Sequence, residues 1–459
     1  MSILKAIIAD KDFLRLLFRL ALPLIVQQWI QASLGFVDLL MVGQLGDVAV
    51  AAVGLSNQFF FLLNLVTFGL GSGTAIFTAQ FWGKHDLAGI RKTLGFSLMV
   101  SLFISLIFSL LAVLAPQRIL GLYTSDPAVV EAGAGFLRIV GLCFIFSSCS
   151  FSLIAVLRSM EQIRIPILVT IGALSLNTLL GYLLIFGHLG LPQMGIRGAA
   201  TGTAIAYILE FLVLVLLVRR AGSPLAGRLS EIFTLDWGFF GRFLRTTSPV
   251  VLNEFLWALA TTVYAGIYAR IGTESIAAVN ISSSIEQMGY VTFIGLANAC
   301  AIMVGNRIGA GESGRAFEYS KRFIAICLAG SLLLGLILLL VSPALLNLYA
   351  ISENAHFYAR NILRIFSFTL WVRIINIVII IGILRSGGDT RFSFLVDVLS
   401  IWLVGIPMAL LGAFVLHLPV YWVYLMVISE ELIKMIVMLW RFASKRWMND
   451  LTQTAAALD

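Results

Sequence analysis

Two stretches of this chain repeat one pattern, and the repeat decides the fold. They are GFVDLLMVGQLGDVAVAAVGLSNQ at residues 35–58 and IGTESIAAVNISSSIEQ at residues 271–287. A shift of 226 residues superimposes them, and it also aligns pairs outside both stretches, among them Pro23 with Pro249, Gly69-Leu70 with Gly295-Leu296 and Gly83 with Gly309. Self-similarity at a fixed spacing is typical of a duplicated structural unit. The sequence therefore predicts two similar halves.

The composition around these stretches is that of a membrane protein. Hydrophobic residues make up 60% of the 459 and charged residues only 12%, whereas a soluble domain carries about 25% charged residues. Repeated apolar tracts reach the roughly 20 residues that a membrane-spanning helix needs. We predict an all-α polytopic protein with twelve transmembrane helices, near residues 14–42, 48–81, 92–116, 128–157, 163–187, 197–219, 240–269, 275–305, 321–344, 356–384, 391–415 and 419–442.

The repeat divides these helices into two pseudo-symmetric six-helix lobes. Because each repeat has an even number of helices, both lobes have the same orientation, and their twofold axis runs along the membrane normal. We predict an amino-terminal lobe over residues 1–220, a cytoplasmic linker over 221–239, a carboxy-terminal lobe over 240–445 and a cytoplasmic tail over 446–459.

The distribution of basic residues predicts the orientation in the membrane. Lys and Arg gather at the amino end, in the even-numbered loops and in the tail, while the opposite loops keep little beyond Arg118, Arg197, Arg270 and Arg360. Cytoplasmic segments retain Lys and Arg, so we expect both termini in the cytoplasm and the chain in the plasma (inner) membrane, with no cleaved signal peptide. The net charge of +8 then reflects topology and contact with anionic lipids rather than nucleic-acid binding.

The sequence gives no sign of an enzyme or of an ATP-driven pump. It has no GxxxxGK[ST] or HExxH motif, and none of its four histidines has a plausible nucleophile partner. The cysteines, Cys143, Cys149, Cys300 and Cys327, fall in apolar helices without CxxC spacing, so we expect no disulfide, metal site or cofactor. Two lobes that rock about a central cavity instead predict alternating access, driven by an ion gradient or by the substrate's own gradient.

The repeated stretches, with GTAIFTAQFWGKHD at residues 73–86, AIMVGNRIGAGE at 301–312 and LRSGGDTR at 384–391, resemble the multidrug and toxic compound extrusion (MATE) transporters. The resemblance covers nearly the whole chain. It implies an antiporter that exports organic cations and other drugs in exchange for protons or sodium ions, without a cofactor. Its partners would be small molecules and membrane lipids, and we expect a monomer.

Asp38 is the first candidate site residue, because an ionisable group at membrane depth is costly and marks a functional site by default. It lies roughly 8–12 Å from the turn at Gly43–Gly46, given a rise of about 1.5 Å per residue. Its position matches the acidic residue on the family's first helix, which binds the coupling cation in several members. The alternative is a carboxylate that only holds neighbouring helices together.

The resemblance also suggests partners for Asp38. Asn177 matches the family's Asn on the fifth helix, and Thr203 is our choice for the Thr on the sixth, with Thr201 as the alternative. Gly181 stands where a second Asp would be. Sodium prefers several oxygen ligands and compensating charge, whereas a proton needs one carboxylate, so we favour H⁺ over Na⁺ as the coupling ion.

The candidate substrate residues lie mainly in the second lobe. Glu254 follows Pro249 by five residues, and its repeat mate, the neutral Gln28, is the candidate substrate residue of the first lobe. Glu254 is either a cavity-facing substrate or proton site or a structural hydrogen-bond acceptor, and both interpretations stay open. The other candidates are Trp257 and Tyr264, whose rings suit flat cations, and Asn376, which lies near the position of an acidic residue on the family's tenth helix.

Other charges carry less information. We expect Glu430 and Lys434, spaced i,i+4, to form an ion pair, Asp397 to be interfacial, and residues 385–389 to cap a helix end. The sequence does not say which of the remaining charges face the cavity, namely Glu210, Glu286, Arg373 and Glu431.

Two alternatives to a drug antiporter stay open. A lipid-linked oligosaccharide flippase of the same superfamily would carry several basic residues in its cavity for the diphosphate. A passive pore is disfavoured, because asymmetric buried acids in two bulky lobes suggest gating from both sides.

Overall fold

The computed structural model describes Ile7, residues 9–225, Gly227, residues 229–233 and 236–347, Tyr349 and residues 351–453. The first six residues of the predicted first lobe and the last six of the predicted tail lie outside these ranges. The described elements are α2 (Lys11–Gly43), α3 (Asp47–Gly83), α4 (Leu87–Leu114), α5 (Pro116–Gly121), α6 (Pro127–Gly141), α7 (Phe144–Ser159), α8 (Arg164–Phe186), η1 (His188–Gly190), α9 (Ile196–Arg220), α10 (Leu229–Ile232), α11 (Trp237–Ile271), α12 (Thr273–Gly309), α13 (Ser313–Leu346), α14 (Glu353–Ile377), η2 (Val378–Leu384), α15 (Thr390–Ser400), η3 (Ile401–Gly405), α16 (Ile406–Leu410), η4 (Leu411–Val415) and α17 (Val420–Ala443).

Twelve of these helical segments have the length of a membrane span, which confirms the predicted fold class. Ten are also apolar enough among the described residues, counting α14 with η2 and α15 through η4 as one span each. The pair α6 and α7, bent by 49°, makes an eleventh. The twelfth is α17, which has 24 residues. Its middle turns carry the charged residues Glu430, Glu431 and Lys434.

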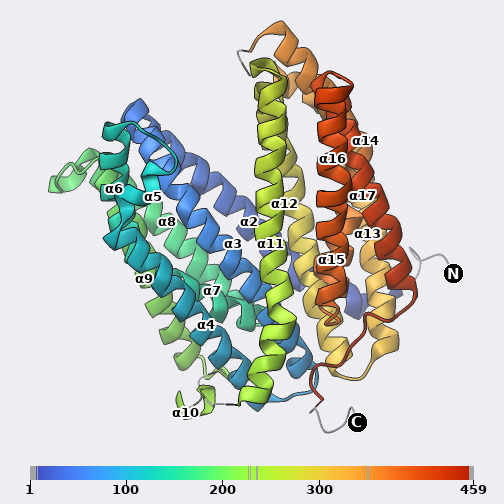
Figure 1. The fold of residues 1–459 in the computed structure, drawn as a ribbon. Coiled ribbons are helices and arrows are strands. Elements are labelled where there is room, and N and C mark those ends of the chain that lie inside the picture. The colour runs from blue at the N-terminus through green and yellow to red at the C-terminus, as the bar shows by residue number, and fades with distance from the viewer. Residues whose placement is uncertain are drawn as a thin grey trace. The chain divides into compact units, whose positions relative to one another are not determined.

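By packing, the chain forms two compact units. One contains residues 26–251, and the other contains residues 1–25 together with 252–459. In Figure 1 residues 26–251 run from blue to green and residues 252–459 from yellow-green to red, while the start of α2, which belongs to the second unit, is at the blue end of the scale. The two boundaries fall inside α2 and α11, a few residues after Pro23 and Pro249. The packing therefore divides the chain within two helices and not in the loop that follows residue 220.

The unit of residues 26–251 has its core between α3, α4, α6, α7 and α9. Phe59, Leu63 and Phe144 are buried there, and the Phe60 ring stacks on Phe144 with centroids 5.1 Å apart. The first turns of α11 belong to this unit, because Phe239 packs edge-on against Phe77. Burial of such rings is a large part of the packing energy of a helical bundle.

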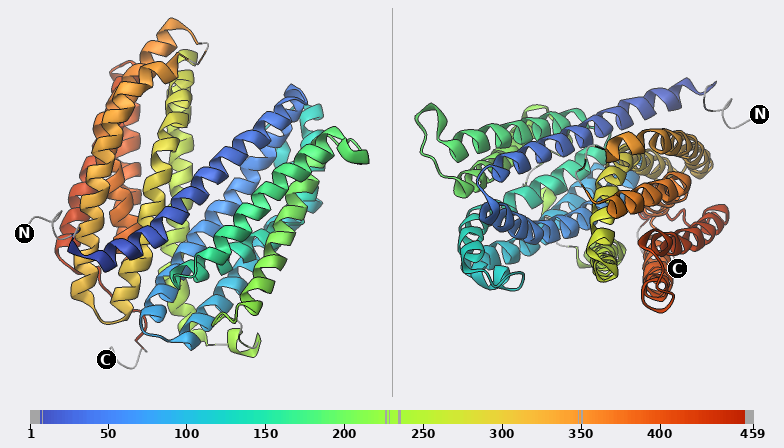
Figure 2. Two further views of the ribbon diagram at one scale, coloured as in Figure 1. Left: turned by 180° about the vertical axis from the view of Figure 1, so that it is seen from behind. Right: turned by 90° about the horizontal axis from the view of Figure 1, so that it is seen from above.

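The first turns of α2 pack in the unit of residues 252–459, as the first turns of α11 pack in the other unit. Phe13 packs against Tyr319 and Phe323 with ring centroids 4.9 and 5.7 Å apart, and Arg322 Nη1 lies 2.6 Å from Asp10 Oδ2. The hydrogen bond from Arg322 lowers the pKa of the Asp10 carboxyl, which precedes α2. α2 is one long helix (dark blue in Figure 2). Pro23 lies inside it and cannot donate a backbone hydrogen bond there.

α8 and α9 approach each other closely because small residues line their contact. A β-carbon at Gly198 would lie 2.5 Å from the carbonyl of Leu184, and one at Gly202 would lie 2.9 Å from the backbone nitrogen of Gly181. In a membrane, where apolar side chains gain little from leaving lipid, such close backbone packing is a main source of helix association. The contact fixes the position of α8.

We expect Gly198→Ala to lower the thermal stability of the detergent-solubilised protein, because the new methyl group would meet the backbone of α8. Overpacking of this kind costs about 1–3 kcal/mol. Gly172→Ala is the matched control on α8, since a β-carbon there meets nothing within 4 Å and Ala favours a helix over Gly by about 1 kcal/mol. Equal melting temperatures for the two variants would contradict the close contact of α8 and α9.

Candidate functional site

Asp38 is held by two hydrogen bonds from one neighbouring helix. Asn177 Nδ2 donates to Asp38 Oδ2 over 2.9 Å, and Thr178 Oγ1 donates to Asp38 Oδ1 over 3.0 Å. Asp38 is half-buried near the end of α2, and both donors lie on α8. Each carboxylate oxygen thus has one donor, which is how a charge at membrane depth is satisfied without a cation. The structure brings together the first two residues of the predicted coupling site.

Thr203 does not complete this site. The Thr203 hydroxyl donates to the backbone carbonyl of Ala199 over 3.0 Å. The Thr201 hydroxyl donates to the backbone carbonyl of Arg197 over 2.8 Å. Thr and Ser in helices commonly satisfy themselves on a carbonyl four residues back. Thr178 supplies the hydroxyl instead. The sequence offers no signal for this contact, because adjacent residues on a helix point in different directions and only the packing of α8 on α2 brings both to Asp38.

On α2 the buried glutamine is Gln27, which directly precedes the predicted substrate residue Gln28. Gln28 is half-buried, whereas Gln27 is buried and its Oε1 accepts from Arg158 Nη2 over 2.9 Å. Glu210, one of the charges that the sequence left unassigned, accepts from Thr170 Oγ1 over 2.9 Å. Charged groups inside this unit are therefore engaged with partners on other helices.

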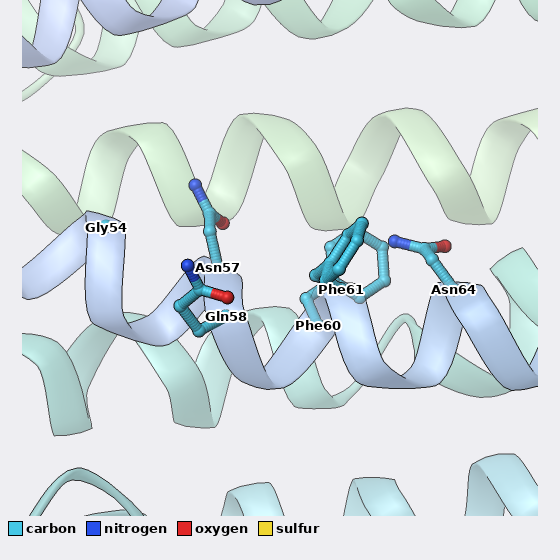
Figure 3. A pocket seen from close by; sticks show the side chains of 6 residues that line it. All are labelled: Gly54, Asn57, Gln58, Phe60, Phe61 and Asn64. Carbon is cyan, nitrogen blue, oxygen red and sulfur yellow. The ribbon is translucent and has the colours of Figure 1, made fainter. Parts of the chain in front are cut away.

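One face of α3 forms an open pocket of about 410 Å³, lined by Gly54, Asn57, Gln58, Phe60, Phe61 and Asn64. Figure 3 shows these residues following one another along the helix. Three side-chain amides can donate and accept hydrogen bonds without carrying charge, and two phenyl rings offer stacking surfaces. The volume lies in the range of small-molecule sites. This pocket was not predicted as a unit from the sequence.

Glu254 forms an ion pair in the unit of residues 252–459. Its Oε1 lies 2.9 Å from Arg385 Nη1, and the Arg385 side chain is only 3% exposed. Of the two open interpretations of Glu254, this contact matches the structural one. It also shows that Arg385 does more than cap a helix end, because its guanidinium is buried against α11.

Two expectations about the last helices are wrong. Lys434 does not pair with Glu430: its Nζ lies 2.8 Å from Asp397 Oδ1 and 3.5 Å from Glu431 Oε2. Asp397 is buried rather than interfacial, and it also accepts from Asn253 Nδ2 over 2.9 Å. The i,i+4 spacing allows a Glu430–Lys434 contact, but Lys434 reaches across to α15 instead.

Two further predicted substrate residues are engaged within the protein. Tyr264 OH donates to Glu430 Oε2 over 2.9 Å, and Asn376 Nδ2 donates to Glu431 Oε2 over 2.7 Å. Trp257 is 44% exposed. The remaining charges form a separate cluster, in which Arg373 Nη1 lies 3.4 Å from Glu286 and 3.0 Å from Tyr290 OH, and Tyr424 OH donates to Glu286.

Membrane-length helices in two related sets, each with charged groups that have partners on other helices, define a polytopic membrane protein. The MatE family model matches residues 23–183 and 249–411. The chain belongs to the multidrug and toxic compound extrusion (MATE) family, whose members are transporters and not enzymes.

Relatives and solved structures agree with this assignment. The uncharacterized transporter YisQ of Bacillus subtilis is 24% identical over 440 residues, 96% of each chain. The probable multidrug resistance protein NorM of Photorhabdus laumondii is 29% identical over 413 residues, 88% of each chain. The bent form of the Vibrio cholerae MATE transporter VcmN matches the fold with a TM-score of 0.86 at 18% identity, covering 95% of this chain and 97% of that one.

Thr178, which contacts Asp38, and Thr203, which does not complete the site, allow a matched test. Removing a hydrogen bond to a charged group costs about 1.5–3 kcal/mol, so we expect Thr178→Val to slow transport of a fluorescent organic cation in proteoliposomes by roughly tenfold or more. Thr203→Val should leave the rate within about twofold, because its hydroxyl serves only its own helix. A larger loss in Thr203→Val than in Thr178→Val would show that Thr203 is the true partner.

Proposed function

We propose that this transporter is a secondary active antiporter that exports organic cations and other amphipathic drugs in exchange for protons by alternating access. The observation that carries the proposal is Asp38, which is held at membrane depth by Asn177 and Thr178 of α8. The names of the relatives, several of them probable multidrug resistance proteins, support the choice of substrate.

The two hydrogen bonds supply a coupling mechanism. As a carboxylate, Asp38 attracts a cationic substrate and needs both donors, which tie α2 to α8. Proton binding from the more acidic exterior removes the charge and weakens both hydrogen bonds, so α2 can repack and the drug leaves. Release of the proton to the cytoplasm restores the binding form. A ligand shifts such an equilibrium only through different affinities for the two states, and here the proton and the drug favour opposite states.

The surroundings of Asp38 favour a proton over sodium. Sodium prefers several oxygen ligands and compensating negative charge, whereas a proton needs one carboxylate, and Gly181 stands where a second carboxylate would be. Sodium stays the alternative coupling ion.

The open face of α3 is the proposed place for the substrate's flat, apolar part. The exposed Phe61 offers a ring for stacking and cation–π contact, beside Phe60, whose ring is stacked on Phe144. Asn57, Gln58 and Asn64 offer neutral hydrogen bonds that different drugs could use. We further infer a monomer in the plasma membrane, in contact with anionic lipids, with both termini cytoplasmic. A flippase for a diphosphate-linked lipid is not favoured, because no cationic residue lines this pocket.

Asp38→Asn should abolish pH-gradient-driven efflux of the fluorescent cation from proteoliposomes, because an amide neither gains nor loses a proton near neutral pH. The variant should stay folded and inserted. Asp47→Asn is the control, since Asp47 is an exposed aspartate at the start of α3 and should retain the rate.

Efflux that persists in Asp38→Asn under the same pH gradient would refute the role of Asp38. Transport by the unmodified protein that follows an imposed sodium gradient and ignores the pH gradient would replace the proton by sodium.

A further inference from the structure

Among the residues that the structure describes, one group of charged side chains between the helices of the unit of residues 252–459 holds more acids than bases. Three cationic side chains, Arg373, Arg385 and Lys434, meet five carboxyl groups, those of Glu254, Glu286, Asp397, Glu430 and Glu431. Three ion pairs use all three cations, namely Arg385 with Glu254, Arg373 with Glu286 and Lys434 with Asp397.

The two carboxyl groups left over are not equivalent. Glu431 shares Lys434 at 3.5 Å, accepts from Asn376 and is 18% exposed. Glu430 is 6% exposed, and among the residues that the structure describes it takes part in no ion pair. Its hydrogen bond is the one from the Tyr264 hydroxyl. An ionised carboxylate in such surroundings is costly unless it is paired, whereas a protonated carboxyl needs no cation.

The place of this pair within its lobe matches the place of Asp38 in the other. Tyr264 is the repeat mate of Asp38: each follows the proline of its helix, Pro249 or Pro23, by 15 residues. Asp38 is held by the fifth helix of its lobe, α8. Tyr264 and Glu430 lie against Gly405 on η3, in the fifth span of the second lobe, where an added β-carbon would overlap both side chains.

We propose that Glu430 is a second proton-binding site, the counterpart in the second lobe of the Asp38 site, and that it holds a proton in this conformation. In the first lobe the carboxyl is on the first helix. In the second lobe the first helix contributes a tyrosine hydroxyl, and the last helix contributes the carboxyl. That this proton takes part in coupling rests on the proposed function, but its presence on Glu430 does not.

The charged and titratable neighbours of Glu430 and Tyr264 come from three helices. α11 contributes Tyr264 and Tyr268, α14 contributes Arg373, and α17 contributes Glu431 and Lys434. Residues 401–405 of η3 include no titratable side chain. Loss of the proton would place a negative charge one helical turn from Lys434, where it competes with Asp397 for the ammonium group.

The backbone beside Glu430 offers a way to respond. η3 and η4 are π-helical segments on either side of Pro407, and π-helical turns within α-helices are frequent at functional sites. A change in the Asp397–Lys434 ion pair would act on α15, which continues directly into η3.

Infrared spectroscopy of the full-length protein in lipid tests the proposal, because un-ionised carboxyl groups have a stretching band separate from that of carboxylates. At neutral pH we expect Glu430→Gln to lose one such band completely. Glu353→Gln is the control, since Glu353 is an exposed glutamate of the same unit, and it should keep every band. An unchanged set of bands in Glu430→Gln would overturn the proposal.

Tyr264→Phe provides a second test if Glu430→Gln fails to fold. It removes the hydroxyl that contacts Glu430 and keeps the ring, so the band of a protonated Glu430 should shift in frequency, and bands that all stay in place would contradict the proposal. Asp38→Asn cannot remove the Glu430 band. Loss of efflux coupling at Asp38 and loss of the Glu430 proton are therefore separate results.

Discussion

The rest of this structure depends on the need to satisfy charge inside apolar helices. Water cannot solvate a carboxylate within a membrane span, so a partner on another helix must. Asp38 has this partner in α8, through one amide and one hydroxyl. In the second lobe the partners of three acids are Arg373, Arg385 and Lys434. Each such contact ties two spans together, and a change of protonation at one end of it can release them.

The two lobes use this constraint differently although they derive from one repeat. After the shared proline the first lobe has Gln27 and Gln28, and the second has Asn253 and Glu254. Gln27 accepts from Arg158, whereas Glu254 pairs with Arg385, and these two arginines occupy matching places in the repeat. An arginine that donates to an uncharged amide in one lobe thus corresponds to an arginine in an ion pair in the other. In the first lobe the Asp38 carboxylate is bound by hydrogen bonds from Asn177 and Thr178.

The fold could be predicted from the sequence because the patterns that indicate it extend over many residues. Apolar tracts and the 226-residue repeat extend over hundreds of residues, so single errors do not change the result. The site was less predictable. Asp38 and Asn177 emerged from burial and family resemblance, but Thr178 was missed because side-chain direction on α8 depends on how α8 packs against α2. Lys434 was assigned to Glu430 by helix spacing, and only the packing of α17 on α15 places it on Asp397. A local pattern cannot contain such a contact between distant segments.

Proton release on substrate binding tests the central claim most directly. If a proton on Asp38 opposes drug binding, linkage requires that drug binding releases that proton. Calorimetric titration of an organic cation into the full-length protein, in buffers of different ionisation enthalpy, counts the protons released. We predict a measurable release by the unmodified protein that Asp38→Asn lowers by at most one proton, the limit that linkage at a single carboxyl sets. The same release in both proteins would contradict the account.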